Sequence, residues 1–228
     1  MIDVTTDQPQ PNESPDIFSY ERVLIEQHGA AWLKQHRAEM RPILQFGDTR
    51  TALGIGAVAP NFTLTDTAGK PYVLSELLPH GPVVALFYRG GWCPFCNVQL
   101  RAFQLASSRL RALKAQVVLI SPQESNQSLS LIERHALTFP LLTDVGNHVA
   151  RQYGLAFQLN PAVRDGYLAI DVDLAHINDD ASWELPMPAT FVIDRAGLIR
   201  YSFVSADYTQ RSEPADVLAA LQRIARGR

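Results

Sequence analysis

The sequence contains 228 residues, of which 46% are hydrophobic and 19% are charged, and it carries a formal net charge of −3. This composition is typical of a globular chain and is sufficient for one α/β domain with an added segment. Lys and Arg are scattered rather than clustered, so we expect no binding of nucleic acid or of acidic lipid surfaces. The longest apolar run, residues 83–88, is far too short to span a bilayer.

The part of the chain before residue 54 has two sections of different character. Residues 1–15 are rich in Pro, Gln, Asn, Asp and Thr, which predicts a disordered leader, and they lack the features of a secretory signal. We therefore expect a cytoplasmic location. Residues 16–53 are predicted to be a helical extension with two short amphipathic helices. Their apolar faces would either cover the main domain or form an arm that docks onto a partner or makes a homodimer.

Residues 54–228 show alternating strand and helix patterns. A small hairpin is expected around a turn at Gly69 and Lys70. Apolar runs and alternation then predict strands over residues 83–88, 116–121, 141–142, 190–194 and 199–204. Helical spacing predicts helices over residues 96–110, 125–135 and 147–153, and a last helix that begins near Ser212. Residues 155–186 form a long insertion without a clear pattern, and we interpret its acidic residues as solvated surface.

This order of elements predicts an α/β domain whose parallel core is closed by an antiparallel hairpin. The reactive loops of such a sheet lie at the carboxyl ends of its parallel strands. The strand over residues 83–88 leads directly into Cys93-Pro94-Phe95-Cys96. We therefore expect the cysteine pair at this edge of the sheet.

The cysteine pair has the local sequence of a redox site. Gly90 and Gly91 allow a sharp turn out of the strand, and Pro94 suits the first position of a helix. Cys93 is then the N-cap, where free amide groups and the helix dipole favour a thiolate, with Cys96 one turn away to form a disulfide. Inert buried cysteines and a metal site are the alternatives. The six His residues show no ligand spacing relative to the pair, so no metal is expected.

Several short motifs then follow one another in a recognisable order. They are residues 58–64 (VAPNFTL), Phe87-Tyr88, residues 141–144 (LLTD), residues 190–194 (TFVID) with Gly197 after them, and Gln210-Arg211-Ser212. In this order and spacing, residues 54–228 resemble the peroxiredoxin (AhpC/TSA) branch of the thioredoxin superfamily. The resemblance implies a thioredoxin-like fold, with a mixed central sheet flanked by helices.

The match to the peroxiredoxin motif PxxxTxxC is incomplete. It places the peroxidatic cysteine on Cys96, the Thr on Cys93 and the Pro on Arg89, so two of the three residues differ. The CxxC spacing instead resembles glutaredoxins and thioredoxins, in which the first cysteine attacks. Local helix-cap chemistry favours Cys93, which we also expect to be the more exposed sulfur, as the first nucleophile. Pro188 matches the cis-proline of the reductases, so a cis Met187–Pro188 peptide is expected.

The resemblance also implies the roles of other residues. Arg211 matches the arginine near the peroxidatic sulfur and would stabilise a thiolate. Arg89, Trp92 and Pro188 are candidate substrate-binding residues, whereas Tyr208 is interpreted as solvated surface together with Asp207 and Asp66.

The implied function is a thiol-dependent peroxidase that reduces hydrogen peroxide or alkyl hydroperoxides through a sulfenic acid and an intrachain disulfide. It needs no metal or organic cofactor, and a thioredoxin- or glutaredoxin-like donor would reduce it. Two alternatives stay open: a thiol–disulfide reductase acting on protein disulfides, and a redox-sensing interaction module that uses the N-terminal arm.

Overall fold

The computed structural model describes residue 31 and residues 47–227. The expected leader and the two expected N-terminal helices lie outside the described residues. Among the described residues, no helix combines the length and the apolar character needed to cross a membrane.

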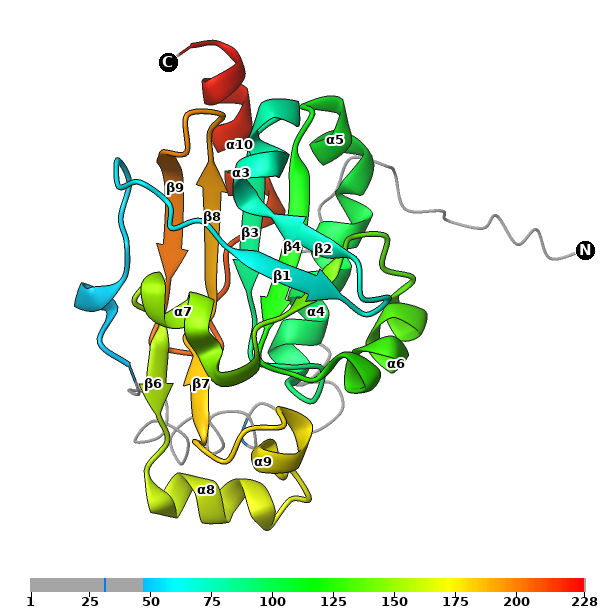
Figure 1. Ribbon diagram of the computed structural model, residues 1–228, viewed down its shortest axis with the longest axis vertical. Helices are drawn as coiled ribbons and strands as arrows, with labels where there is room; N and C mark the ends of the chain where they lie inside the picture. Colours follow the sequence, from blue (N-terminus) through cyan, green and yellow to red (C-terminus); the bar gives the residue numbers. More distant parts are fainter. Residues whose placement is uncertain (1–30, 32–46, 228) are drawn as a thin grey trace, which may run out of the picture.

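A seven-stranded mixed sheet forms the centre of the protein (Figure 1). Its strand order is β2-β1-β5-β4-β3-β8-β9. Strands β3, β4 and β5 run parallel, while β8 and β9 add an antiparallel hairpin on one side and β1 and β2 another on the opposite side. The bounds are β1 (Thr63–Asp66), β2 (Pro71–Val73), β3 (Val83–Phe87), β4 (Gln116–Ser121), β5 (Leu141–Thr143), β8 (Ala189–Ile193) and β9 (Ile199–Val204). The expected α/β, thioredoxin-like architecture is confirmed.

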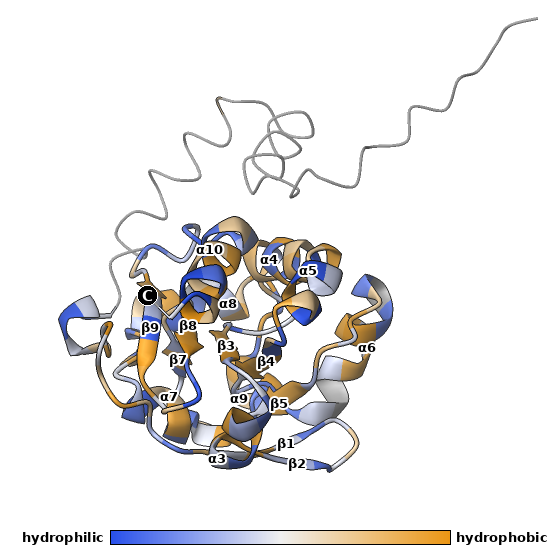
Figure 2. Cartoon of the chain, turned by 90° about the horizontal axis from the view of Figure 1, so that it is seen from above, coloured by the Kyte–Doolittle hydropathy of each residue, from blue (hydrophilic) through white to orange (hydrophobic). Residues whose placement is uncertain are grey.

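Helices cover both faces of this sheet (Figure 2). They are α3 (Leu74–Leu77), α4 (Pro94–Leu105), α5 (Ser107–Ala112), α6 (Ser125–His135), α7 (His148–Gln152) and α10 (Pro214–Ala225). Short 3-10 turns occur at Thr49–Thr51, Leu78–His80 and Val145–Asn147. Alternate residues of the central strand β3 point into two different cores. Leu86 packs with residues of α4, α5, α6 and α10, whereas Phe87 packs with residues of α3 and α7. Every residue of β3 is therefore buried, as its continuous apolar run predicts.

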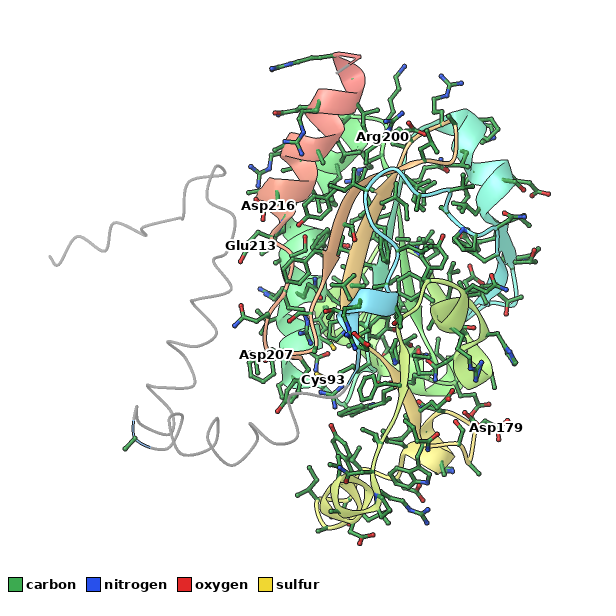
Figure 3. All side chains as sticks on the ribbon, turned by 90° about the vertical axis from the view of Figure 1, so that its left-hand side faces the viewer. Cys93, Asp179, Arg200, Asp207, Glu213 and Asp216 are labelled. Atoms are coloured by element: carbon green, nitrogen blue, oxygen red, sulfur yellow. The ribbon has the colours of Figure 1, made fainter. Side chains whose placement is uncertain are left out.

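Residues 155–186, here called the β6–β7 segment, fold into a small layer of their own. The layer consists of β6 (Ala156–Gln158), α8 (Pro161–Leu168), α9 (Leu174–Ile177) and β7 (Glu184–Pro186), with β6 and β7 paired antiparallel. A separate apolar cluster that includes Val163, Tyr167 and Leu185 holds it together, and Trp92 packs against this cluster. Of its acidic residues, Asp171, Asp173 and Asp179 are exposed, as expected, whereas Asp180 is half-buried; Asp179 is labelled in Figure 3.

Three local expectations need correction. The helix expected over residues 96–110 is divided into α4 and α5 at Ala106. The last helix begins at Pro214 rather than near Ser212, because the Ser212 hydroxyl is hydrogen-bonded to the Tyr201 hydroxyl and Glu213 takes the N-cap position. The Met187–Pro188 peptide is trans, since the described residues contain no cis peptide bond. The trans isomer is the one that X–Pro bonds generally favour.

Candidate active site

The cysteine pair lies where the sequence places it, between the end of β3 and the start of α4. Gly90 turns the chain out of the strand with a φ of +146°, and a side chain on it would collide with the Trp92 indole. Cys93 is the N-cap of α4 in extended conformation, and Pro94 is the first helical residue. Cys96 follows within the first turn. The predicted position of the pair at the carboxyl edge of the parallel strands is thus confirmed.

Both sulfur-bearing residues are buried, so Cys93 is not exposed to solvent as the helix-start argument assumed. Their exposed fractions are 1% for Cys93 and 0% for Cys96, and both are free thiols. The Cys93 side chain makes no capping hydrogen bond to the amides of α4. The helix-start argument fails because the pair is set into the core that contains Tyr88 and Leu131, and is not presented to solvent at a free helix end.

Arg211, from the loop between β9 and α10, is placed against both sulfurs. Its Nη2 lies 3.4 Å from the Cys96 Sγ and 3.9 Å from the Cys93 Sγ. Its Nη1 donates to the backbone carbonyls of Tyr208 and Gln210. These contacts fix the guanidinium in an almost fully buried position. Figure 3 labels Cys93 and also Asp207, which belongs to this same loop.

The surroundings shift the pKa values of the two thiols in opposite directions. Burial raises the pKa of Cys93, and the neighbouring Cys96 sulfur raises it further. Burial also acts to raise the pKa of Cys96, but a hydrogen bond from Cys93 and the charges of Arg211 and Arg89 together hold that pKa well below its ordinary value. Together with the 3.4 Å contact to Arg211, this favours the charged form at Cys96, with the Cys93 thiol beside it. The helix-start argument favours Cys93 instead.

Arg89 is the second cation of the site. Its Nη1 lies 3.9 Å from the Cys93 Sγ, and its Nη2 donates to the Tyr167 hydroxyl. The guanidinium carbon lies 4.3 Å from the Tyr208 ring centroid, 4.7 Å from that of Trp92 and 5.7 Å from that of Tyr167. Arg89 is thus enclosed by three aromatic rings, an arrangement that favours a desolvated cation.

Tyr167 and Tyr208 are functional neighbours that the sequence analysis missed. Tyr208 was interpreted as solvated surface, but its ring packs on Arg89 and on Phe95, the latter with ring centroids 5.6 Å apart. Tyr167 comes from α8 in the β6–β7 segment and also contacts Trp92 at 5.3 Å between ring centroids. The only available sequence signal was the position of Tyr208 three residues before Arg211; nothing in the sequence pointed to Tyr167.

The remaining predicted site residues are also gathered here. Pro188 borders a very small cavity of about 10 Å³ together with Arg89, Tyr167 and Tyr208, which is about the space of one water molecule. Trp92 forms part of the lining of a larger cleft of about 320 Å³, whose wall also includes Pro94, Asn97 and Gln123. All six predicted residues, Cys93, Cys96, Arg211, Arg89, Trp92 and Pro188, therefore lie in one region.

Within the described residues, the two guanidinium groups of the site form no ion pair with a carboxylate. In residues 47–227, ion pairs occur at Arg50, Arg151 and Arg200, and neither Arg89 nor Arg211 takes part in one. The same residues contain no group of three or more His, Cys, Asp or Glu that could hold a metal. Two buried guanidinium groups therefore face two sulfurs, so the negative charge that they stabilise is that of a thiolate.

The fold and the site together define a thioredoxin-fold protein with a buried dithiol and two cations. The family model described as AhpC/TSA matches residues 55–202. The chain belongs to the AhpC/TSA family.

Among curated proteins, the chain is similar to a chloroplastic peroxiredoxin Q of Triticum aestivum, at 29% identity over 148 residues. The match covers 65% of this chain and 58% of the relative, so the chain spans little more than half the length of that protein. A putative peroxiredoxin bcp of Buchnera aphidicola is 32% identical over 105 residues, which is 46% of this chain and 66% of the relative.

Among solved structures, the peroxidoxin BcpB of Mycobacterium tuberculosis superposes with a TM-score of 0.60 at 26% identity. The match covers 75% of this chain and 98% of that one.

Proposed function

We propose that the protein is a thiol-dependent peroxidase in which Cys96 attacks the peroxide and Cys93 resolves the product. The observation that carries this assignment is the 3.4 Å contact between the Arg211 Nη2 and the Cys96 Sγ. A buried guanidinium at that distance favours the charged form of the sulfur, which is the nucleophile. The family of the chain and its peroxiredoxin relatives support the same activity.

The first step uses the thiolate of Cys96. Its sulfur attacks the outer oxygen of the peroxide, a sulfur–oxygen bond forms and the oxygen–oxygen bond breaks. The sulfur is oxidised to a sulfenic acid, and the departing hydroxide or alkoxide takes up a proton. The Cys93 thiol is hydrogen-bonded to the Cys96 sulfur, so it is a proton donor in contact with the reacting atom.

The second step joins the two sulfurs. Cys93 displaces the oxygen of the sulfenic acid, and water leaves as the disulfide forms. A thioredoxin- or glutaredoxin-like dithiol then reduces the disulfide through a mixed disulfide. Because each turnover consumes such a donor, we propose a reducing compartment such as the cytoplasm.

The closed surroundings of the sulfurs favour a small substrate. Exposed fractions of 1% and 0% leave no surface on which a folded protein disulfide could reach either sulfur, whereas hydrogen peroxide is little larger than water. This argues for a peroxidase over a reductase of protein disulfides. The CxxC spacing still favours the reductase as the second candidate, so the experiment below includes it.

The test is stopped-flow measurement of peroxide consumption by the reduced protein, with a parallel insulin-reduction assay. Fast consumption with slow insulin reduction is expected, and the opposite pattern would favour the reductase. A pure redox sensor would be oxidised once but would not turn over with a thioredoxin donor.

The assignment of the attacking sulfur is tested with single variants exposed to one equivalent of peroxide and dimedone. The Cys93→Ser protein should form the adduct on Cys96, whereas the Cys96→Ser protein should form little on Cys93. Rapid adduct formation on Cys93 alone would reverse the two roles.

A further inference from the structure

The contacts of Arg89 connect the β6–β7 segment with the chemistry of Cys93. Arg89 is 3% exposed, and within residues 47–227 no carboxylate pairs with it. Its Nη2 is held by the Tyr167 hydroxyl, which leaves Nη1 directed at the Cys93 Sγ. The Tyr167 contact comes from α8, 78 residues away in the sequence. The position of the cation at Cys93 therefore depends on a segment outside the cysteine loop.

The charges around Cys93 change when Cys96 is oxidised. The groups that face Cys93 are Cys96 on α4, Arg89 before that helix, Tyr167 on α8, and Tyr208 and Arg211 in the loop before α10. In the reduced pair, burial and the Cys96 thiolate keep the pKa of Cys93 high, while the two arginines lower it. Conversion of Cys96 to a neutral sulfenic acid removes the opposing charge, whereas burial and both arginines remain. The change therefore favours the thiolate form of Cys93.

Building on the proposed peroxidase function, we propose that Arg89 is the catalytic cation of disulfide closure and that Tyr167 positions it at Cys93. Closure begins from a Cys93 thiolate, whose proton has passed to the departing oxygen of the peroxide. The thiolate attacks the Cys96 sulfenic sulfur, the sulfur–sulfur bond forms and the sulfur–oxygen bond breaks. Hydroxide leaves and is protonated to water; the Cys93 sulfur is oxidised and the sulfenic sulfur is reduced.

The test separates the two steps by rapid quenching of the full-length protein after mixing with hydrogen peroxide. Mass spectrometry after alkylation and dimedone trapping measures thiol, sulfenic acid, disulfide and sulfinic acid at each time point. The main variant is Tyr167→Phe, which keeps the ring on Arg89 but removes the hydroxyl acceptor. Its matched control is Tyr153→Phe, a buried tyrosine whose hydroxyl donates to the Pro60 carbonyl at 3.0 Å on the other face of the sheet.

In Tyr167→Phe we expect the rate of disulfide closure at pH 7, taken relative to the rate of the first oxidation step, to be about tenfold lower than in the wild type. The reason is that the thiolate fraction of Cys93 falls. Closure should recover as the pH rises, and sulfinic acid should accumulate at excess peroxide. Arg89→Met should slow closure further, and Arg89→Lys should restore part of the rate. The Tyr153→Phe control should close at the wild-type rate.

The proposal is overturned if closure in Tyr167→Phe equals that of the control, or if the loss is the same at every pH and Arg89→Lys is no better than Arg89→Met. These results leave the peroxidase intact as long as Cys96 still forms its sulfenic acid. Absence of that first phase in the wild-type protein would instead refute the proposed function itself.

Discussion

Replacement of Arg211 by methionine is the most direct perturbation of the attacking sulfur. Methionine keeps much of the buried volume of the arginine stem but removes the guanidinium that lies 3.4 Å from the Cys96 Sγ. The Cys96 thiolate would then retain Arg89 as its cation, and Arg89 contacts the other sulfur, that of Cys93, at 3.9 Å. We expect a smaller thiolate fraction and a weaker hold on the charge that shifts to the peroxide oxygen.

The size of the effect follows from the distance and the burial. Two opposite unit charges 3.4 Å apart attract each other by about 5 kcal/mol at an effective dielectric constant of about 20. Part of this attraction only offsets the cost of burying the two charges. Single preorganised donors in active sites typically contribute about 100-fold to the rate or more. We therefore expect Arg211→Met to slow the first oxidation step at pH 7 by about 100-fold, equivalent to about 2.7 kcal/mol.

The assay is stopped-flow oxidation of the reduced protein over a range of pH. Loss of the cation raises the pKa of Cys96, so the rate deficit of Arg211→Met should shrink as the pH rises towards 9. Arg211→Lys should recover part of the rate. The control is Arg195→Met, which should behave like the wild type, because Arg195 is exposed and donates to the Pro79 carbonyl. An unchanged rate, or a deficit that is constant from pH 6 to 9, would refute thiolate stabilisation by Arg211.

Two further predictions concern the stability of the fold. Gly154→Ala should lower the free energy of unfolding by about 1–3 kcal/mol, because φ is +71° there and a Cβ would collide with the Thr51 carbonyl. The measurement is urea denaturation, and the control is Gly166→Ala, since a Cβ at Gly166 would face open space. The low pKa of Cys96 in the folded protein makes the free energy of unfolding depend on pH. The stabilisation by the Cys96 thiolate is complete above the ordinary thiol pKa of 9.0, and it is lost as the pH falls through the pKa of Cys96 in the folded protein. The stability advantage of the reduced wild type over Cys96→Ser should therefore shrink from pH 9 to pH 6, and a constant advantage would contradict this linkage.

The main strands and helices could be predicted because their patterns are local. The apolar run of β3 and the spacing of α6 indicate their elements without knowledge of the tertiary structure. The β6–β7 segment could not be predicted in this way, since its two strands have three residues each and its core forms only when α8 and α9 fold over them. The start of α10 was misplaced for a similar reason: a distant residue, Tyr201, takes the Ser212 hydroxyl.

The membership of the site could be predicted, but the roles of its two sulfurs could not. Helix-cap reasoning uses only the residues next to Cys93, and it treats the helix start as open to solvent. Burial of the pair and its contact with Arg211, 115 residues beyond Cys96, favour the charge on Cys96. The motif alignment also places the peroxidatic position on Cys96, which agrees with the role proposed above.

The two departures from the peroxiredoxin motif are linked in the structure. Arg89 stands at the motif's Pro and Cys93 at its Thr, and the Arg89 Nη1 is directed at the Cys93 Sγ. In the proposed mechanism, a resolving cysteine within one turn of Cys96 removes the need to bring a distant cysteine to the sulfenic acid. It also places that thiol in the core, where burial raises its pKa. A cation beside it offsets that effect. The loss of the proline and the gain of the second cysteine are therefore best understood as one chemical change, in which the residue that replaces the proline supplies the charge that the new cysteine requires.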